Sequence, residues 1–474
     1  MTAGAGEHEE HRFEARLGLW SAVALVAGSM VGSGIFIVSG DIARRLPGPG
    51  WLLLVWGLAG VLTVAGALSY GRLAAAMPRT GGQYVYLTEL YGPLWGFLYG
   101  WTLVLVIQTG TIAAVAVAFA TFAGTLWPAL SSGGALVRVG SLSVTPVQGV
   151  AVVTIVALTA LNARGLEGGR RVQDVLTAVK VLTLGAVVVL GFVLGDPTAR
   201  AANLARPAFA TNGSFATTAA QLGPAMVGAL FSADAWANVT FTAAEVRRPE
   251  RTIPLALVLG TALVCVLYVA TNVAYLNVLP LVGTPGAGDV LARGLQHATA
   301  DRVGTAVVEH LTGGSHGAAI MAVAVMISTF GCANGLVLAG ARVMWAMARD
   351  GLFVGAAGTL SARRVPAAAL WLQGAWASLL ALSGRYGDLL DYVIIAELLF
   401  YLLTVGALMR LAQRTGERPR GAAYPWLQVG YLAAVSVLVL DLLVTKPAYT
   451  WGSCAVVLSG LPVYAVLRRA PSSA

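Results

Sequence analysis

Two glycines flank a serine in the first apolar run of the chain, as Val31-Gly32-Ser33-Gly34 within residues 17–38. Glycine disfavours the helix, and a membrane interior penalises any backbone N–H or C=O group that lacks a partner. A helix that unwinds here must therefore line a protein-enclosed site, where its N–H groups can bind an anion such as a carboxylate. The alternative is an unbroken helix whose small residues pack closely against a neighbour.

A second polar interruption lies in the apolar run 219–245, where Phe231-Ser232-Ala233-Asp234 precedes Trp236. A carboxylate halfway across a membrane is costly, and by default it indicates a functional site. Three interpretations of Asp234 are open. It binds the ammonium group of a ligand, it carries a proton, or it caps the helix that follows by accepting hydrogen bonds from the N–H groups of residues 236 and 237.

Lys180 and Glu397 are further charged residues within apolar runs. Lys180 is one of two lysines in the chain, although arginine is frequent elsewhere. A desolvated lysine can lose its proton whereas arginine cannot, so a lysine kept at this depth indicates a functional role. The alternative is a lysine that extends toward the membrane interface. For Glu397 four interpretations are open: it faces a central cavity, pairs with an arginine, takes part in proton coupling, or lies at an interface. Gln108 is a candidate contact for the side chain of a ligand.

The composition excludes an ordinary soluble domain. Of the 474 residues, 57% are hydrophobic and 11% charged, whereas soluble domains carry roughly 25% charged residues. Apolar runs long enough to cross a bilayer begin near residues 17, 50, 94, 146, 172, 219, 254, 318, 366, 388, 424 and 448. They predict an all-α integral membrane protein with twelve transmembrane helices in the lipid bilayer.

The net charge of +9 reports topology rather than a nucleic-acid partner. Most arginines fall in the two terminal segments and the even-numbered loops, so the positive-inside rule predicts that both termini lie in the cytoplasm. We expect the protein to lie in the cell (inner) membrane. The cysteines Cys265, Cys332 and Cys454 lie in apolar runs and predict neither a metal site nor a disulfide framework. We find no nucleotide-binding loop or catalytic triad, so neither an enzyme nor a cofactor is expected.

The two interruptions lie in the first and the sixth predicted spans, so the second block of helices starts in the opposite orientation. This arrangement is expected of two inverted five-helix repeats. We therefore predict a cytoplasmic tail at residues 1–16, a first repeat at 17–200, a second repeat at 201–415, and two additional helices with a short tail at 416–474.

The order and spacing of several segments resemble the L-type amino-acid transporter branch of the amino acid–polyamine–organocation (APC) superfamily. These segments are Val31–Phe36, Pro78–Tyr86, Phe231–Trp236, Glu245–Pro254, Ser328–Gly335, Arg342 and Ala348–Gly351. The resemblance extends from Leu17 to about Arg410. It implies a LeuT-type fold and sodium-independent transport of amino acids by alternating access, either as exchange or as proton-coupled uptake.

The resemblance also implies roles for individual residues. Backbone amides within Val31–Gly34 bind the substrate carboxylate, carbonyls of Phe231, Ser232 and Ala233 bind its ammonium group, and the Phe231 ring closes over it. Lys180 takes the place of a sodium ion and braces the first interruption near Gly28 and Ser328.

The chain departs from this branch at Asp234, where a small residue is usual. If Asp234 faces the ligand, the implied alternative is a transporter of polyamines or cationic amino acids and amines, with Asp234 as the ammonium partner. Animal members of the branch attach a single-span partner through a cysteine between spans three and four. The corresponding loop here, Trp127–Thr145, contains no cysteine, so no disulfide-linked accessory subunit is expected.

Overall fold

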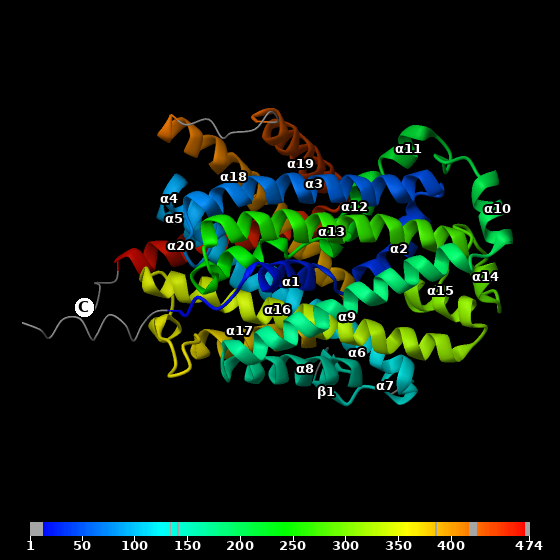
Figure 1. Ribbon diagram of the computed structural model, residues 1–474, viewed down its shortest axis with the longest axis horizontal. Coiled ribbons are helices and arrows are strands. Elements are labelled where there is room, and N and C mark those ends of the chain that lie inside the picture. The colour runs from blue at the N-terminus through cyan, green and yellow to red at the C-terminus, as the bar shows by residue number, and fades with distance from the viewer. Residues whose placement is uncertain (1–12, 133, 140–141, 384–385, 417–423, 470–474) are drawn as a thin grey trace, which may run out of the picture.

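The computed structural model describes residues 13–132, 134–139, 142–383, 386–416 and 424–469. The long helices run side by side along one axis of the molecule (Figure 1). The α-helices are α1 Leu19–Met30, α2 Gly34–Arg45, α3 Pro49–Ala76, α4 Gln83–Tyr91, α5 Pro93–Thr102, α6 Gln108–Leu126, α7 Pro128–Ser132, α8 Pro146–Ala163, α9 Leu166–Val193, α10 Pro197–Ala205, α11 Phe215–Ala219, α12 Leu222–Ser232, α13 Pro249–Val278, α14 Val290–Arg293, α15 Val303–Thr312, α16 Ser315–Arg349, α17 Ala367–Ser383, α18 Tyr386–Thr415, α19 Trp426–Thr445 and α20 Pro447–Arg469.

Shorter elements complete the description. A π-helical turn, η1 Leu103–Ile107, joins α5 to α6, and the 3₁₀ helices are η2 Trp236–Glu245, η3 Thr299–Asp301 and η4 Gly355–Gly358. The strands β1 Val137–Val139 and β2 Leu142–Val144 form an antiparallel hairpin between α7 and α8. Seven of the described helices, α3, α5, α7, α8, α10, α13 and α20, begin at a proline, where its missing N–H group costs nothing.

Among the described residues, ten helical segments are long and apolar enough to cross a membrane. Two of the twelve predicted spans are not among these ten. The span expected from residue 219 is divided into α12 and η2, and the span expected from residue 366 is the apolar but shorter helix α17. The chain is therefore an all-helical, multi-pass membrane protein apart from its one short hairpin.

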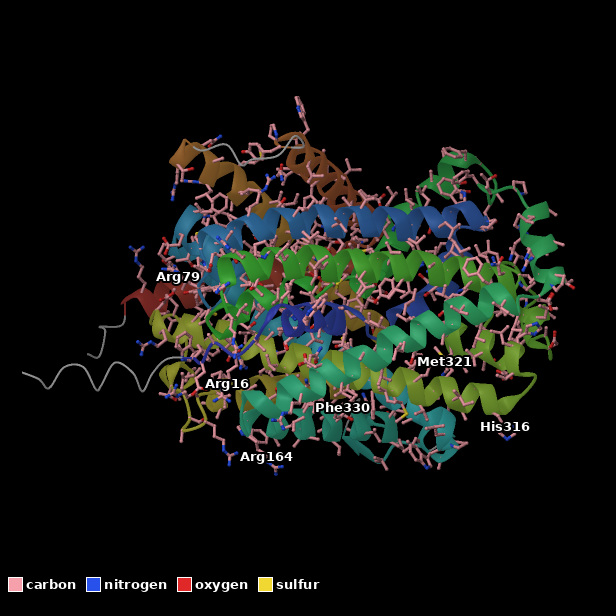
Figure 2. All side chains as sticks on the ribbon, in the orientation of Figure 1. Arg16, Arg79, Arg164, His316, Met321 and Phe330 are labelled. Atoms are coloured by element: carbon pink, nitrogen blue, oxygen red, sulfur yellow. The ribbon has the colours of Figure 1, made fainter. Side chains whose placement is uncertain are left out.

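The two ends of the bundle differ in charge. Arg16, Arg79 and Arg164 lie at the end shown on the left, where the described part of the chain begins and ends, and His316 lies at the opposite end (Figures 1 and 2). We call these the terminal end and the distal end. The short helices α10, α11, α14 and α15 gather at the distal end (Figure 1).

Asp196 connects two of the short distal helices. Its carboxylate accepts hydrogen bonds from the N–H groups of Thr198 and Ala199 at the start of α10, and it lies 3.0 Å from His310 Nε2 on α15. The hydrogen bond from Ala199, together with those from His310 and Thr198, holds the pKa of Asp196 below its ordinary value.

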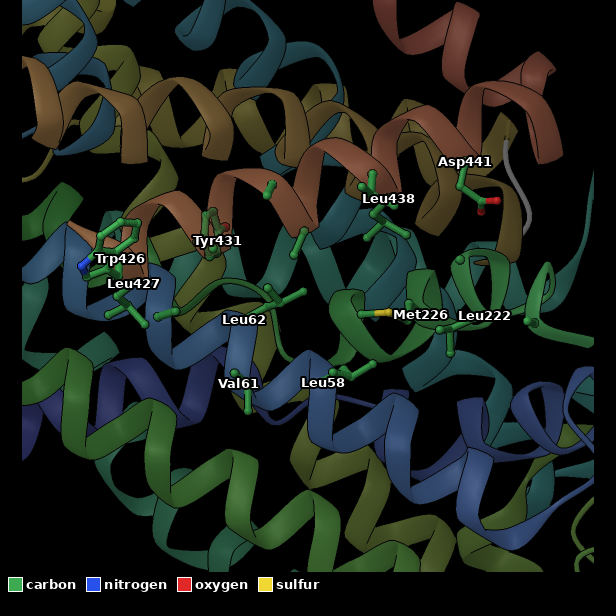
Figure 3. A pocket seen from close by; sticks show the side chains of 17 residues that line it. Leu58, Val61, Leu62, Leu222, Met226, Trp426, Leu427, Tyr431, Leu438 and Asp441 are labelled. Atoms are coloured by element: carbon green, nitrogen blue, oxygen red, sulfur yellow. The ribbon is translucent and has the colours of Figure 1, made fainter. Parts of the chain in front are cut away.

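A large groove, with a volume of about 800 Å³, lies between α3, α12 and α19 on the outside of the bundle (Figure 3). Its wall is almost entirely aliphatic, and the exposed side chains of Val61, Trp426 and Val437 lie along it. Asp441 is its one charged residue. An apolar wall of this kind offers few hydrogen-bond partners to a polar ligand.

Candidate functional site

The first predicted interruption is a true break in the helix. α1 ends at Met30, Val31 is extended with φ −76° and ψ 92°, and α2 starts at Gly34. We call Val31–Ser33 the first break. It is completely enclosed, since Val31 is fully buried and Ser33 is only 1% exposed. The alternative of an unbroken helix with close packing does not describe this segment.

The carbonyls that this break frees each find a donor from a neighbouring helix. Lys180 Nζ on α9 donates to Gly28 O at 2.5 Å and to Val31 O at 2.9 Å. Ser328 Oγ on α16 lies 3.1 Å from Val31 O and 3.0 Å from Gly32 O. Since Lys180 is only 2% exposed and is bound to the break, it does not extend to the membrane interface.

Two more donors were not anticipated from the sequence. Cys332 Sγ on α16 donates to Ser29 O at 2.9 Å, and the Tyr268 hydroxyl on α13 lies 3.1 Å from Met30 O. The same hydroxyl lies 2.9 Å from Ser232 O in the sixth span. In the sequence, Tyr268 is a residue with one hydroxyl group in a largely apolar run, and this does not identify its hydrogen-bond partner.

The second interruption separates α12 from η2. Ala233 closes α12, and Ala235 adopts the left-handed conformation with φ 66°. A residue with a β-carbon pays about 1–2 kcal/mol for that conformation, so the surrounding packing must enforce it. We call Ala233–Ala235 the second break. Phe231 and Ser232, in the last turn of α12, are both buried.

The Asp234 carboxylate is bound by α18 and also by the N–H group of Ala235, just before η2. Its Oδ1 accepts a hydrogen bond from the Tyr401 hydroxyl on α18 at 2.5 Å. Among the described residues it accepts none from the N–H groups of Trp236 or Ala237, so the capping interpretation does not hold. The Tyr401 ring is stacked on Trp236, with 5.3 Å between their centroids.

The two breaks face each other. A methyl group placed on Gly34 would lie 2.0 Å from Ser232 Oγ, so the first residue of α2 contacts the last residue of α12. The N-terminus of a helix carries a partial positive charge and the C-terminus a partial negative charge. A site between the start of α2 and the end of α12 therefore offers both signs of charge to one small dipolar molecule.

The predicted ligand contact Gln108 is buried and engaged by a neighbouring helix. Its amide Nε2 donates to Leu336 O at 2.7 Å, which ties α6 to α16. It lies immediately after the π-helical turn η1, a distortion that is frequent near functional sites.

A buried ion pair closes the terminal end of the bundle. Arg342 Nη2 on α16 donates to Glu245 Oε1 at the end of η2 at 2.8 Å, and both side chains are 1% exposed. Arg342 also donates to Leu338 O on its own helix. Both residues belong to the segments that resemble the L-type transporter branch. Neither their spacing nor their residue types predicted that they form a pair.

The N-terminal segment Phe13–Gly18, which we call the N-terminal strap, covers this ion pair. The N–H groups of Arg16 and Leu17 donate to Glu245 O at 2.9 and 2.8 Å, and Arg247 N donates to Leu17 O at 2.8 Å. The Arg342 guanidinium lies 5.9 Å from the centre of the Phe13 ring. The strap and the ion pair together bind the sixth span to α16.

Among the described residues, no group of three or more His, Cys, Asp or Glu side chains is placed to hold a metal ion. The three cysteines are unbridged, with Cys265 and Cys332 buried and Cys454 partly exposed.

We predict that Arg342→Leu destabilises the protein by about 3–5 kcal/mol, because it leaves the carboxylate of Glu245 buried without a counter-charge. The double variant Arg342→Leu/Glu245→Leu is expected to recover most of this loss, since both charges are then absent. Thermal unfolding of the detergent-solubilised protein measures the effect. A double variant as unstable as the single one would contradict the assignment of charge pairing as the cause.

Comparison with known proteins identifies the family. The amino acid permease family model matches residues 17–460. The chain is 27% identical to the serine/threonine exchanger SteT of Bacillus subtilis over 471 residues, which cover 98% of this chain and 99% of that protein. It is 28% identical to human b(0,+)-type amino acid transporter 1, over 94% of this chain and 87% of that protein. It is 27% identical to human large neutral amino acids transporter small subunit 2, over 94% of this chain and 79% of that protein. These relatives are transporters and exchangers rather than enzymes, and the chain described here belongs to the amino acid permease family.

Proposed function

We propose that this protein carries amino acids across the cell membrane by alternating access, without sodium, as an exchanger or in a proton-coupled uptake cycle. The observation that carries the proposal is the pair of facing helix breaks. The α-carboxylate and α-ammonium groups of an amino acid match the positive start of α2 and the negative end of α12. The alternating-access cycle then consists of opening this enclosed site to one side of the membrane at a time.

In the proposed complex, the N–H groups of Gly32, Ser33 and Gly34 bind the substrate carboxylate, with Val31 as the start of the unwound segment. The carbonyls of Phe231, Ser232 and Ala233 accept from the substrate ammonium, and the Phe231 ring covers it. The main support is the contact between Gly34 and Ser232, which holds the two sets of groups within reach of one small molecule.

The environment of Lys180 supports sodium independence. Main-chain carbonyls and a serine hydroxyl are oxygen ligands of the kind that sodium uses, and here Gly28 O and Val31 O accept from the Lys180 ammonium. We propose that this fixed positive charge replaces the ion. Ser328, which shares Val31 O with Lys180, is then part of the same coupling site.

The position of Asp234 favours neutral substrates over the alternative of polyamines or cationic amines. Its carboxylate is engaged by Tyr401 on α18 rather than by groups of the first break. An arrangement with Asp234 as the ammonium partner would first require that hydrogen bond to break. The names of the relatives, a serine/threonine exchanger and a large neutral amino acids transporter, support the same preference.

We also propose two inverted repeats, at residues 17–200 and 201–415, followed by two additional helices in 416–474 and with twelve spans in all. The packing supports this division. α3 packs on α13, α6 on α16 and α8 on α17, and each of these pairs maps onto itself when the two repeats are exchanged. The pair α1–α9 maps onto α12–α18, and α1–η2 maps onto α12–α2, and all four of these contacts are made.

The orientation follows from the charge difference between the ends. We propose that the arginine-rich terminal end lies in the cytoplasm. The predicted cytoplasmic tail 1–16 and the two termini fall largely outside the described residues, and their cytoplasmic location remains a proposal from the sequence. Since Cys265 and Cys332 are buried, and the loop Trp127–Thr145 has no cysteine, we propose that no accessory subunit is linked by a disulfide.

The transport test uses purified protein in liposomes preloaded with an unlabelled amino acid. We expect saturable uptake of labelled L-serine or L-leucine that internal amino acid accelerates and that replacement of sodium leaves unchanged. External alanine should compete, whereas putrescine should not. Competition by putrescine and arginine but not by alanine would instead support the cationic alternative, and conduction without saturation would exclude a transporter.

Lys180→Ala is expected to reduce transport by at least about tenfold, while the protein is still inserted. The variant leaves two buried carbonyls with one donor fewer each, and every such loss costs ~1–3 kcal/mol. Thr183→Ala is the matched control, because the Thr183 hydroxyl bonds only to Val179 O within its own helix. Equal uptake by Lys180→Ala and the control in the liposome assay would refute the coupling role.

The loss of uptake rate caused by alanine at three glycines should increase as the space around each glycine becomes smaller. A β-carbon at Gly34 meets Ser232 Oγ at 2.0 Å, one at Gly32 meets Cys332 Sγ at 3.3 Å, and one at Gly57 meets nothing within 4 Å. Overpacking costs ~1–3 kcal/mol, so Gly34→Ala should lower the uptake rate by about tenfold or more, Gly32→Ala should have a smaller effect, and Gly57→Ala should have none. Uptake that is unchanged in Gly34→Ala would place the substrate away from the two breaks.

A further inference from the structure

Two buried carboxyl groups lie beside the second break, and neither takes part in the binding scheme above. Asp234 is 6% exposed and Glu397, on α18, is 5% exposed. Tyr401 lies one helical turn after Glu397 and donates to Asp234 Oδ1 at 2.5 Å. We call Asp234 and Glu397 the acid pair. The two groups are close enough to interact electrostatically, and Glu397 Oε2 has no hydrogen-bond partner within the described part of the chain.

Within the described part of the chain, no positive charge is found to compensate the acid pair. The titratable groups that interact with it from the surrounding helices are phenols and one thiol: Tyr70 on α3, Tyr99 on α5, Cys332 on α16, Tyr401 on α18 and Tyr431 on α19. No lysine, arginine or histidine is among them. Two carboxylates that share an enclosed site without a cation repel each other strongly, and such pairs hold one proton between them.

The space beside Asp234 is too small for an organic ligand. A cavity of about 20 Å³ lies between Asp234, Tyr401 and Trp236, with Leu62 and Tyr431 in its wall. That volume holds about one water molecule. Leu62 and Tyr431 also line the large outer groove (Figure 3). A proton, with at most one water, is the ligand that fits.

We infer that Asp234, Tyr401 and Glu397 form a proton-binding site, and that the protein moves one proton together with each amino acid. The inference rests on the proposed transport function and chooses proton-coupled uptake from its two modes. Asp234 belongs to the second break, so an opening of the substrate site also hydrates the acid pair. The proton enters from water on the side where the amino acid binds, is shared by the pair while the site is closed, and returns to water on the opposite side.

The experiment measures amino-acid counterflow without a gradient, and then proton movement with a pH-sensitive dye inside the liposomes. For one proton per amino acid, a difference of one pH unit should raise the accumulation ratio about tenfold. External amino acid should acidify the interior of liposomes that hold wild-type protein. In Glu397→Gln, proton movement per amino acid taken up should fall at least tenfold. Asp441→Asn, a carboxyl-to-amide change in α19 outside the acid pair, is the control and should behave as wild type.

The outcomes separate the two proposals. Absence of counterflow in the wild type would reject the transport function itself. Counterflow without proton movement would reject the proton site alone, as would a Glu397→Gln variant with wild-type proton movement. If Glu397→Gln does not fold, Tyr401→Phe is measured instead, since it removes the hydroxyl between the carboxyl groups but keeps the ring on Trp236. Its pH profile of uptake should be displaced from that of the wild type, and a superimposable profile would contradict the inference.

Discussion

The need to satisfy every main-chain carbonyl in a membrane determines the centre of this structure. Where α1 stops, four consecutive carbonyls, from Gly28 O to Val31 O, lose their partners in the helix. Lys180, Cys332, Tyr268 and Ser328 supply donors from three different helices. The break therefore exists only because α9, α13 and α16 hold those side chains against it. The carbonyls also constrain the positions of these three helices, since a shift of any of them would leave a buried carbonyl without a donor.

The same requirement determines which main-chain groups at the two breaks can bind a ligand. With the carbonyls of the first break engaged, the start of α2 presents N–H groups, which lack the partners that a preceding helical turn would supply. At the second break, the end of α12 presents carbonyls instead. The two breaks are thus complementary rather than equivalent, which is the property that we propose a zwitterionic substrate exploits. The buried pair Arg342–Glu245 and the N-terminal strap keep this centre closed at the terminal end.

Much of this could be predicted from the residues. Helix-breaking types at Gly32–Gly34 and at Asp234, at membrane depth, were enough to locate both interruptions, and apolar length was enough for ten of the spans. The neighbourhood of Lys180 with Gly28 and Ser328 was expected from the family resemblance. What could not be predicted depends on side-chain direction. Nothing in the local sequence distinguishes an Asp234 that caps its own helix from one that turns to Tyr401, or a Gln108 that faces a ligand from one that bonds to Leu336 O. Contacts between distant helices, such as Arg342 with Glu245, likewise depend on tertiary packing rather than on any periodicity.

Tyr268 has one hydroxyl proton but lies within hydrogen-bonding distance of carbonyls from both broken spans, Met30 O and Ser232 O. A single proton cannot fully satisfy two acceptors, so the spans compete for it whenever they are together. When the spans move apart, the carbonyl that gives up the Tyr268 hydroxyl must accept a hydrogen bond from water or from an incoming ammonium group instead. Substrate binding and separation of the two spans would then be coupled, because the substrate ammonium group replaces the Tyr268 hydroxyl as the hydrogen-bond donor to one of these carbonyls.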